Sequence, residues 1–320
     1  MQVKVSILTV FYNRYELVKE SMESLLNQSA NNFEIIAIDD GSTDNTYEEL
    51  SKFDTYDNVR IVRLENGGFV NAIRHAVDIA KGEYIAIHGS GDISHVERIK
   101  VQAKYLDEKR NIGLVACKSR FEVVGTDTSY IQGEVFEGDY SLKFLNKNYF
   151  HHGEVMFRKS LYNKVGGYRI LFKFAQDIDL WCRMSSHADF SLLDKVLYTR
   201  YVNQPNSVSE DPAKTQLQRK LAQFAVHCHE MRLNNKGDPL DKYGIYSLID
   251  FKPKGLGYVY FKQAIRQTIS ENLVSAQLFL DWSIKERYLP SYFLCFLLKY
   301  LPGFTVKLLK FLLSLITKNK

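Results

Sequence analysis

Cysteine is scarce in this chain of 320 residues, and the few that occur are far apart. The four cysteines are Cys117, Cys182, Cys228 and Cys295, and no two of them form a CxxC pair. Such wide separation argues against the disulfide framework of a small secreted domain and against a zinc site built on cysteine pairs. We therefore expect reduced thiols in a cytoplasmic protein.

The sequence also lacks a long uninterrupted hydrophobic run. Its first residues, MQVKVSILTVFYNR, contain no apolar segment followed by a small-residue cleavage site, so no signal peptide is predicted. The most apolar stretch, residues 288–320, is interrupted by Lys299, Lys307, Lys310 and the Pro302-Gly303 pair. Because a spanning helix needs ~20 consecutive apolar residues, this stretch does not predict one.

Strong net charge and a triphosphate-binding loop are absent as well. The formal charge is +5 at pH 7, too small by itself to indicate nucleic acid, and we expect no nucleic-acid partner. No glycine-rich loop followed by lysine comes after the first apolar run. This absence weakens one alternative, a nucleotidyltransferase that binds a nucleoside triphosphate.

What the chain does contain is a regular alternation of apolar strands and amphipathic helices. Residues 3–11 are a β-branched apolar run, and residues 15–27 place apolar side chains at helical spacing. The alternation returns with NFEIIAIDD, VRIVRLE and EYIAIHGSGD, which have helical segments between them. This pattern predicts an α/β fold with a mostly parallel sheet covered by helices on both faces.

Polar groups follow each of the predicted strands. In a parallel sheet, ligands bind beyond the carboxyl ends of the strands, so these groups are expected to share one edge. The stretch EYIAIHGSGD ends by presenting Asp92 beside Gly89 and Gly91, which leave room for a ligand to approach the backbone. A carboxylate in that position can hold a cation or a polar ligand.

Four segments, in this order, resemble the motifs of family 2 glycosyltransferases. SILTVFYNR resembles their SIIxPVYNR opening, and IIAIDDGSTDNT resembles their DDGSTDxT signature. NGGFVNAIRHAVDIAKGEYIAIHGSGD resembles the segment that ends in their acidic motif, and MFRKSLYNKVGGYRILFKFAQDIDLWCRM resembles the one that ends in ED-x-D-L-W-x-R. The resemblance covers roughly residues 3–209. It implies a GT-A fold and inverting transfer of a sugar from a nucleotide-sugar donor, expected to be a UDP-sugar, to a hydroxyl.

The resemblance also implies a set of donor-binding residues at the strand ends. Asp39 is expected to contact the base or ribose, Tyr12 to stack on the base, and Arg14 and Arg74 to approach the phosphates. A turn and helix cap at residues 40–46 is the alternative for the second of these strand ends. The full set is Val10, Tyr12, Asn13, Arg14, Asp39, Asp40, Gly67, Asn71, Arg74, Ser90 and Gly91.

Asp92 is the implied ligand of a Mg²⁺ or Mn²⁺ ion that neutralises the leaving diphosphate. Many relatives end this strand with D-x-D-D, whereas this chain has a single carboxylate after Gly89, Ser90 and Gly91. With one protein carboxylate, phosphate oxygens and water must complete the shell of the metal, so we expect weak metal affinity without donor. The alternative is that Asp92 caps the next helix.

Asp177, in AQDIDLW, matches the aspartate that serves as general base in the family. Gln176 replaces the usual neighbouring glutamate, which removes a like charge beside Asp177. His152, Glu154 and Gln176 are expected to border the acceptor, although a buried histidine and a capping aspartate are the alternatives for His152 and Asp177. Asp179 is interpreted as structural. Arg200 and the segment 207–209 resemble the closing motif of the family without its histidine.

The chain is expected to divide into a catalytic domain over residues 1–210 and a helical region over residues 211–320. Apolar residues in FTVKLLKFLLSLITKNK cover a broad helical face studded with lysines. Such a helix can lie on an anionic membrane, which predicts a peripheral protein on the inner face of the cell membrane acting on a glycan or lipid-linked acceptor. Packing of this helix on protein is the alternative.

A different class of function also accommodates these motifs. Many relatives have acidic residues at the positions of Gly89, Gly91 and Gln176. The loss of these carboxylates is compatible with a non-catalytic partner subunit or sugar-binding module. Hydrolysis of UDP-sugars by the isolated protein would separate this reading from an active transferase.

Overall fold

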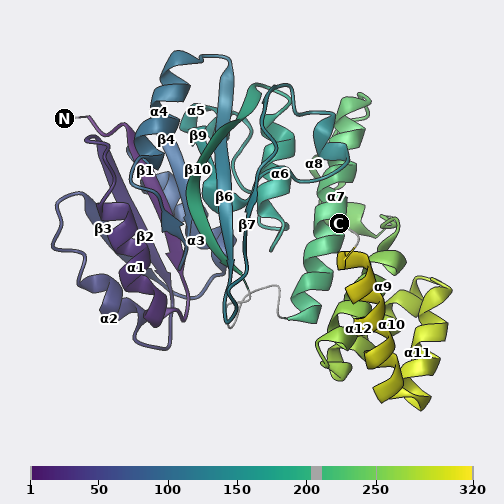
Figure 1. Ribbon diagram of the computed structural model, residues 1–320. Helices are drawn as coiled ribbons and strands as arrows, with labels where there is room; N and C mark the ends of the chain where they lie inside the picture. Colours follow the sequence, from purple (N-terminus) through teal and green to yellow (C-terminus); the bar gives the residue numbers. More distant parts are fainter. Residues whose placement is uncertain (1, 203–210, 250, 319–320) are drawn as a thin grey trace.

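A computed structural model of the chain describes residues 2–202, 211–249 and 251–318 (Figure 1). Its strands join into one ten-stranded sheet. They are β1 (Val5–Phe11), β2 (Phe33–Asp40), β3 (Val59–Leu64), β4 (Tyr84–Gly89), β5 (Ile93–Ser94), β6 (Ile112–Val123), β7 (Ser129–Gln132), β8 (Phe136–Gly138), β9 (Met156–Arg158) and β10 (Asp189–Val202).

The main path through the sheet runs β3-β2-β1-β4-β9-β6-β10-β5, with β7 beside β6 and β8 beside β10. The first four strands in this order are parallel. Strand β9 pairs antiparallel with both β4 and β6, so β6 runs in the same direction as β4, and β10 is parallel to β6. The carboxyl ends of β1, β2, β3, β4, β6 and β10 therefore meet at one edge of the sheet.

Helices cover both faces of this sheet, and further helices follow beyond it. The helices have the following bounds. They are α1 (Tyr15–Leu26), α2 (Thr46–Ser51), α3 (Phe69–Ile79), α4 (Arg98–Glu108), α5 (Lys159–Lys164), α6 (Gln176–Met184), α7 (Pro212–Leu233), α8 (Pro239–Tyr243), α9 (Leu256–Ile269), α10 (Leu273–Lys285), α11 (Pro290–Tyr300) and α12 (Pro302–Lys318). Short 3-10 turns occur at Lys143–Leu145, His152–Glu154 and Gly244–Leu248. The predicted α/β architecture is confirmed.

Alternation along β1 shows why the sheet is covered twice. Leu8 and Val10 point into a core closed by α3, α5, α6 and α7, whereas Val5 and Ile7 point into a second core closed by α1, α2 and α4. Successive strand residues face opposite sides, so a strand that is apolar throughout can be buried only between two layers. The near-continuous apolar runs in the sequence have this cause.

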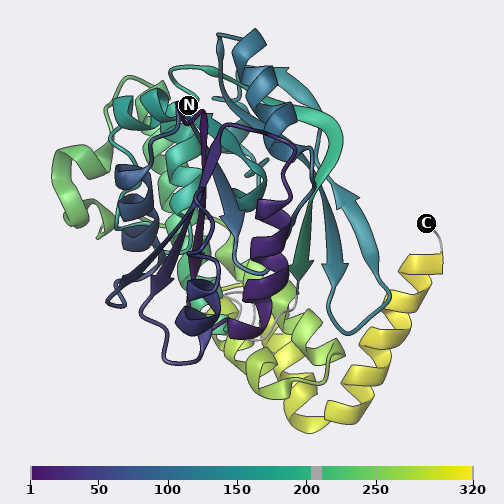
Figure 2. The same cartoon turned by 90° about the vertical axis from the view of Figure 1, so that its left-hand side faces the viewer.

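Beyond the sheet, α9 to α12 pack around a third apolar cluster that includes Leu256, Tyr260 and Leu280. Figure 2 shows these green to yellow helices beneath the sheet-containing body. Helix α7 instead contributes Phe224 and Cys228 to the core of the sheet, although it lies in the predicted C-terminal region. In the part of the chain that the structure describes, no helix is both long enough and apolar enough to cross a bilayer.

Candidate active site

The loops after β1 and β2 are joined by hydrogen bonds at the carboxyl edge of the sheet. Asn13, at φ 50°, donates its backbone N–H to Ser42 Oγ (3.0 Å) and accepts at Oδ1 from Thr43 N (2.8 Å). The Arg14 N–H donates to Thr46 Oγ1 (2.7 Å). Tyr12 between these contacts is 47% exposed, so its ring is available for stacking.

The two aspartates that end β2 lie in different surroundings. Asp39 is fully buried; its Oδ1 accepts from Ser42 N (3.2 Å), and its Oδ2 lies 3.3 Å from Arg63 Nε without a geometrically good hydrogen bond. Asp40 accepts from Gly67 N (3.0 Å), and burial raises the pKa of its carboxyl. Asp39 therefore keeps acceptor capacity for a ligand, whereas Asp40 holds the loop after β3.

The remaining predicted donor residues on this side lie on or beside α3. Gly67 accepts at its carbonyl from Asn71 Nδ2 (2.7 Å), which stabilises the first turn of the helix. Arg74 is half-buried on the same helix, and its charge opposes the burial-driven rise in the pKa of Tyr162 on α5. Asn71 therefore serves the loop, and the charge of Arg74 lies close enough to α5 to act on Tyr162.

The tip of β4 explains the stretch that ends in Asp92. The Asp92 carboxylate accepts from Tyr198 Oη (2.8 Å) at Oδ2 and from Tyr201 N (3.3 Å) at Oδ1. It folds back over Gly89, where any Cβ would collide with Oδ2. Gly91 has φ +90°, and a Cβ there would lie 2.7 Å from Leu17 Cδ1. Both glycines are therefore required for Asp92 to point along the tip.

Burial raises the pKa of Asp92 to about 6, against the opposing effects of Arg200, Tyr198, Tyr201 and Arg14. The described residues contain no group of three or more histidine, cysteine, aspartate or glutamate side chains able to hold a metal. From the described residues, each oxygen of Asp92 accepts one hydrogen bond, which leaves lone pairs on both for a ligand. A divalent cation fits this position if a bound ligand supplies most of its shell.

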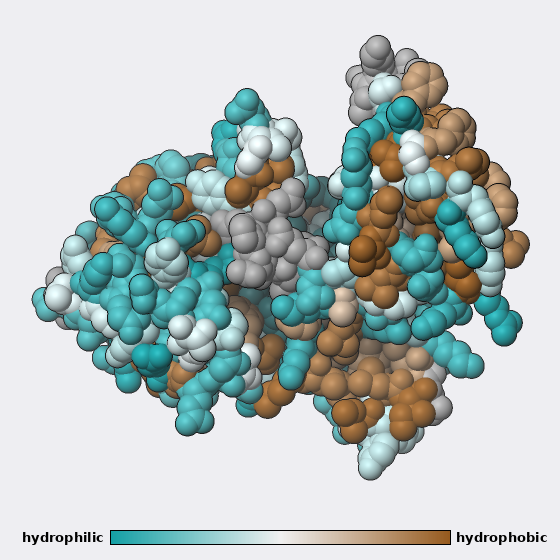
Figure 3. All heavy atoms as spheres, turned by 90° about the horizontal axis from the view of Figure 1, so that it is seen from below, coloured by the Kyte–Doolittle hydropathy of each residue, from teal (hydrophilic) through white to brown (hydrophobic). Residues whose placement is uncertain are grey.

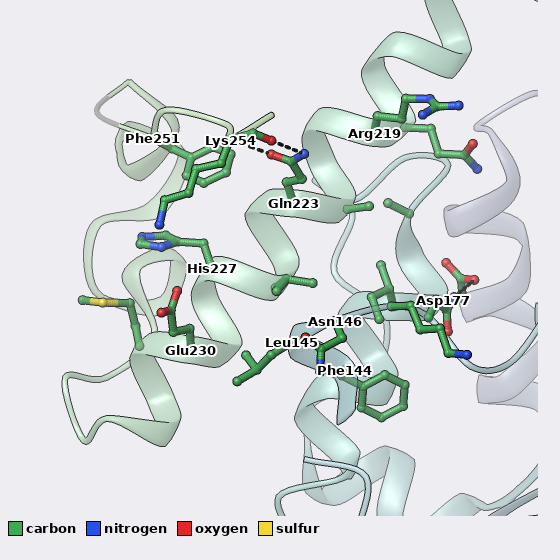
Figure 4. Close-up of a pocket in the computed structure, with 18 of the residues that line it drawn as sticks. Phe144, Leu145, Asn146, Asp177, Arg219, Gln223, His227, Glu230, Phe251 and Lys254 are labelled. Carbon is green, nitrogen blue, oxygen red and sulfur yellow. Dashed lines mark hydrogen bonds between the residues drawn. The ribbon is translucent and has the colours of Figure 1, made fainter. Parts of the chain in front are cut away.

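Asp177 lies in the first turn of α6, at the same edge. Its Oδ2 accepts from Asn148 Nδ2 (2.9 Å), and burial raises the pKa of its carboxyl. The side chain lines a pocket of about 930 Å³ formed with α7 (Figure 4). Beside it, Gln176 Oε1 is buried without a hydrogen-bond partner among the described residues. A carboxylate with a raised pKa facing a pocket has the properties of a general base.

Arg200, near the end of β10, connects these carboxylates electrostatically. Its positive charge lowers the pKa values of Asp92, Asp177 and Glu154 relative to what burial alone would give. Its Nη1 lies 2.9 Å from His151 Nδ1, and its guanidinium lies 5.8 Å from the Phe121 ring centroid. Strand β10 therefore places one cation close enough to act on two carboxylates that are 85 residues apart in sequence.

The comparison with protein families decides the assignment of this site. A family described as "Glycosyl transferase family 2" matches residues 6–175, more than half of the chain. The chain belongs to glycosyl transferase family 2. The resemblance inferred from the sequence is confirmed.

Curated proteins are similar to this family 2 chain over more than half of its length. EpsE of Bacillus subtilis, which carries a glycosyltransferase name, is 32% identical over 186 residues, or 56% of this chain and 66% of that protein. Hyaluronan synthase of Pasteurella multocida is 27% identical over 261 residues, or 81% of this chain and 26% of that protein. The chain thus spans just under two thirds of the first protein and about a quarter of the second.

Solved structures place the family 2 chain in the GT-A fold. S. aureus TarS residues 1–349 in complex with UDP-GlcNAc aligns with a TM-score of 0.61 and 20% identity, over 87% of this chain and 81% of that one. The mannosyltransferase PcManGT of Pyrobaculum calidifontis, in complex with GDP-Man and Mn²⁺, aligns with a TM-score of 0.54 and 16% identity, over 100% and 87%. The predicted fold is confirmed.

Two predicted acceptor residues of this family 2 chain are engaged in internal contacts. His152 Nε2 lies 2.7 Å from Tyr168 Oη, and burial lowers the pKa of the imidazole to about 3. Glu154 accepts from His151 N (3.0 Å) and from the Ser119 hydroxyl, and burial raises its pKa to about 7. These contacts favour a supporting role beneath the site.

The structure brings three further residues to this edge, and of these the sequence had pointed only to Arg200. Asn148 contacts Asp177, Tyr198 contacts Asp92, and Arg200 acts on both carboxylates. Arg200 belongs to the segment that resembles the closing motif of the family, and this was the available signal. Residues 207–209 of that segment lie outside the described part of the chain.

Proposed function

We propose that this chain is an inverting glycosyltransferase that moves a sugar from a UDP-sugar to a hydroxyl of a glycan or lipid-linked acceptor. The observation that carries the proposal is the pairing of Asp92 and Asp177 at one sheet edge under the charge of Arg200. A nucleotide sugar needs one group for the diphosphate and a second for the acceptor hydroxyl. Membership of family 2 favours this reaction over nucleotidyl transfer.

The nucleotide would lie over the ends of β1 and β2. A second pocket of about 620 Å³, lined among others by Asn13, Arg14, Gly91 and Tyr201, opens there. Asp39 has an unfilled acceptor oxygen for the base or ribose, and Tyr12 offers an exposed ring. The TarS structures with UDP and with UDP-GlcNAc support a uridine nucleotide in this role.

Asp92 would hold Mg²⁺ or Mn²⁺ together with the donor, and Ser90 and Gly91 would face the diphosphate. The ion would supply positive charge for the leaving diphosphate. The PcManGT complex with Mn²⁺ supports a metal in a protein of this fold. Arg200 and Arg14, whose charges already act on Asp92, would add fixed positive charge beside it.

Asp177 would accept the proton of the acceptor hydroxyl as the bond from the sugar to the diphosphate breaks. Its raised pKa brings it closer to neutrality, which suits a base. Asn148 holds the carboxylate through Oδ2, so Oδ1 is oriented for the hydroxyl. Attack from the side opposite the diphosphate inverts the anomeric carbon. Gln176 would border the acceptor from the same helix turn.

The C-terminal helices would attach the enzyme to the inner face of a membrane. Large apolar side chains are exposed on α11, on α12 and at the residue between them. We call this set the aromatic face: Tyr292, Phe293, Phe296, Tyr300, Leu301, Phe304, Phe311 and Leu312. Figure 3 shows hydrophobic surface concentrated on this part of the molecule. Exposed Lys299 and Lys307 flank it, which suits an anionic bilayer.

The proposal keeps a catalytic domain and a C-terminal helical region, divided at about residue 210, but it assigns α7 to the catalytic unit. Helix α7 belongs to the core of the sheet and bounds the pocket at Asp177. The helical region would thus contribute α7 to the catalytic unit and α9 to α12 to attachment.

A thermal-unfolding screen with UDP, GDP and their sugars, each with and without Mn²⁺, tests the proposal. UDP at ten times its Kd should stabilise the protein by over ~1 kcal/mol, and Mn²⁺ should enlarge the effect. Slow hydrolysis of one stabilising UDP-sugar should follow. Absence of both binding and hydrolysis across the panel would favour the non-catalytic alternative, which the single carboxylate at the β4 tip motivates.

A further inference from the structure

The pocket at Asp177 continues as a groove along α7. Residues at helical spacing on one face of this helix line it: Gln218, Ala222, Val226, Glu230 and Asn234. At ~1.5 Å per residue, this face extends about 24 Å, much longer than one sugar ring. Figure 4 shows Arg219 and Asp177 toward one end, with His227 and Glu230 farther along the helix. The groove has room for a chain of linked units.

The charge along this groove is mostly positive. Five basic side chains line it, Lys147, Arg219, Lys236, Lys252 and Lys254, against the two carboxylates of Asp177 and Glu230. Lys147 pairs with Glu134 (2.8 Å). Within the described residues, the side chains of the other four make no ion pair or hydrogen bond with an acidic group. Half-buried Arg219 is desolvated enough for burial to lower its pKa.

Residues 251–254, which we call the basic segment, are held against α7. Gln223 Nε2 donates to the Lys254 carbonyl (2.9 Å), and Gln223 Oε1 accepts from the Lys254 N–H (2.9 Å). Phe251 packs on Phe224 and His227, with ring centroids 5.2 and 5.3 Å apart. Lys252 and Lys254 therefore extend from a backbone that is already ordered, which lowers the entropic cost of binding a ligand there.

We propose that the acceptor is a chain with repeated negative charges, phosphodiester or carboxylate, that lies along α7 with its reactive hydroxyl at Asp177. The proposal rests on the proposed function, since it gives the substrate class of the same site. Four cations that have no acidic partner among the described residues, spread along a groove, attract a polyanion and gain little from a neutral glycan. The carboxylate of Asp177 lies where the acceptor presents an uncharged hydroxyl, and Glu230 is exposed and screened by water.

Binding of defined oligomers to the full chain tests this proposal. The probes are an oligogalacturonate, an oligo(glycerol phosphate) and a neutral maltooligosaccharide of equal length, titrated at low and at physiological salt. The test variant is Arg219→Gln, Lys252→Gln, Lys254→Gln. The matched control is Lys19→Gln, Lys100→Gln, Lys195→Gln, which removes exposed lysines outside the groove. UDP affinity and Tm are measured on the same samples.

We expect at least one anionic oligomer to bind the wild type in a salt-dependent manner and the neutral one to bind far more weakly. The groove variant should lose about tenfold in affinity for that oligomer, with a weaker salt dependence, and the control should lose none. Which oligomer binds identifies the anionic group. Failure of both anionic oligomers, equal binding of the neutral one, or an unaffected groove variant overturns the proposal. If the wild type does not bind UDP, that result would instead contradict the proposed function.

Discussion

At the scale of single residues, the site depends on close contacts between side chains and the backbone at the strand ends. Asp92 occupies its position because Gly89 has no Cβ and because Tyr198, from β10, donates to its carboxylate. Asp177 is similarly held by Asn148, from a loop 29 residues earlier. Each proposed catalytic carboxylate thus has one neighbour that fixes its orientation.

Replacing the base should abolish transfer without abolishing donor binding. Asp177→Asn keeps size and most hydrogen bonding but cannot accept a proton, so transfer should fall by ~10²–10⁴-fold. The rate is measured with a donor and acceptor that the wild type uses, and UDP affinity is measured alongside. Asp281→Asn, at an exposed position on α10, is the control and should keep the wild-type rate. Wild-type transfer by Asp177→Asn would remove Asp177 from this role.

Adding one methyl group at Gly89 should displace Asp92. In Gly89→Ala the new Cβ collides with the Asp92 carboxylate. Mn²⁺ should therefore increase the UDP affinity of Gly89→Ala no more than it increases the UDP affinity of Asp92→Asn. Overpacking should also cost ~1–3 kcal/mol of stability. The readouts are UDP titrations with and without Mn²⁺ and denaturant unfolding.

Gly303→Ala is the matched control for this substitution. A Cβ at position 303 meets no atom within 4 Å, so the Mn²⁺ dependence should not change. Because Gly303 is helical, stability should not fall and should rise by ~0.4–1 kcal/mol. If Gly89→Ala and Asp92→Asn both retain the full Mn²⁺ effect, the metal is bound elsewhere.

At the scale of secondary-structure elements, α6 is anchored by a buried ion network. Asp179 accepts from Arg169 and from Arg183, whose Nη2 lies 2.7 Å from Asp179 Oδ2. Arg169 also reaches Asp238 (2.9 Å), which begins α8 and accepts from Leu240 N. The network fixes α6 against the preceding loop and α8, and thereby fixes where Asp177 emerges.

Neutralising Asp179 should therefore cost stability more than chemistry. Asp179→Asn leaves two partly buried guanidinium groups without their shared carboxylate, which should lower the free energy of unfolding by ~3–5 kcal/mol. Denaturant unfolding measures this. Asp241→Asn removes an exposed partner of the same Arg169 and should cost no more than ~0.5 kcal/mol. Equal losses in the two variants would mean that burial does not determine the strength of this network.

At the scale of the whole molecule, the C-terminal helical region carries two surfaces of different character. The groove along α7 is basic, and the aromatic face on α11 and α12 is apolar. The third core beneath that face uses residues such as Leu294 and Leu309, so the exposed aromatics are not needed to complete it. An anionic membrane at the aromatic face and an anionic acceptor in the groove are compatible, because basic side chains would attract each of them.

Removing exposed aromatics should release the protein from membranes without unfolding it. Phe293→Ser, Phe296→Ser, Tyr300→Ser should lower partitioning onto vesicles of phosphatidylglycerol and phosphatidylcholine about tenfold or more. Sedimentation with vesicles measures the bound fraction. The control, Ile245→Ser, Tyr246→Ser, Ile249→Ser, removes three exposed apolar residues elsewhere. Equal sedimentation of both variants and the wild type would argue that the aromatic face packs on protein.

The sequence by itself determined what depends on neighbouring residues. The alternating apolar runs required a sheet buried on both faces, and the strand ends at Asp39 and Asp92 followed from that arrangement. The GSGD tip and the AQDIDLW helix start were visible as short motifs, because turns and helix termini are local in sequence.

Only the tertiary structure decided which distant residues meet. Tyr198 and Arg200 lie in the second half of a long strand, and no local pattern shows that they meet Asp92, more than 100 residues earlier. Helix α7 looked like part of a separate helical region, yet its apolar face completes the core of the sheet. The groove needs α7, α6 and the basic segment together, and packing free energy, which is non-local, sets that arrangement.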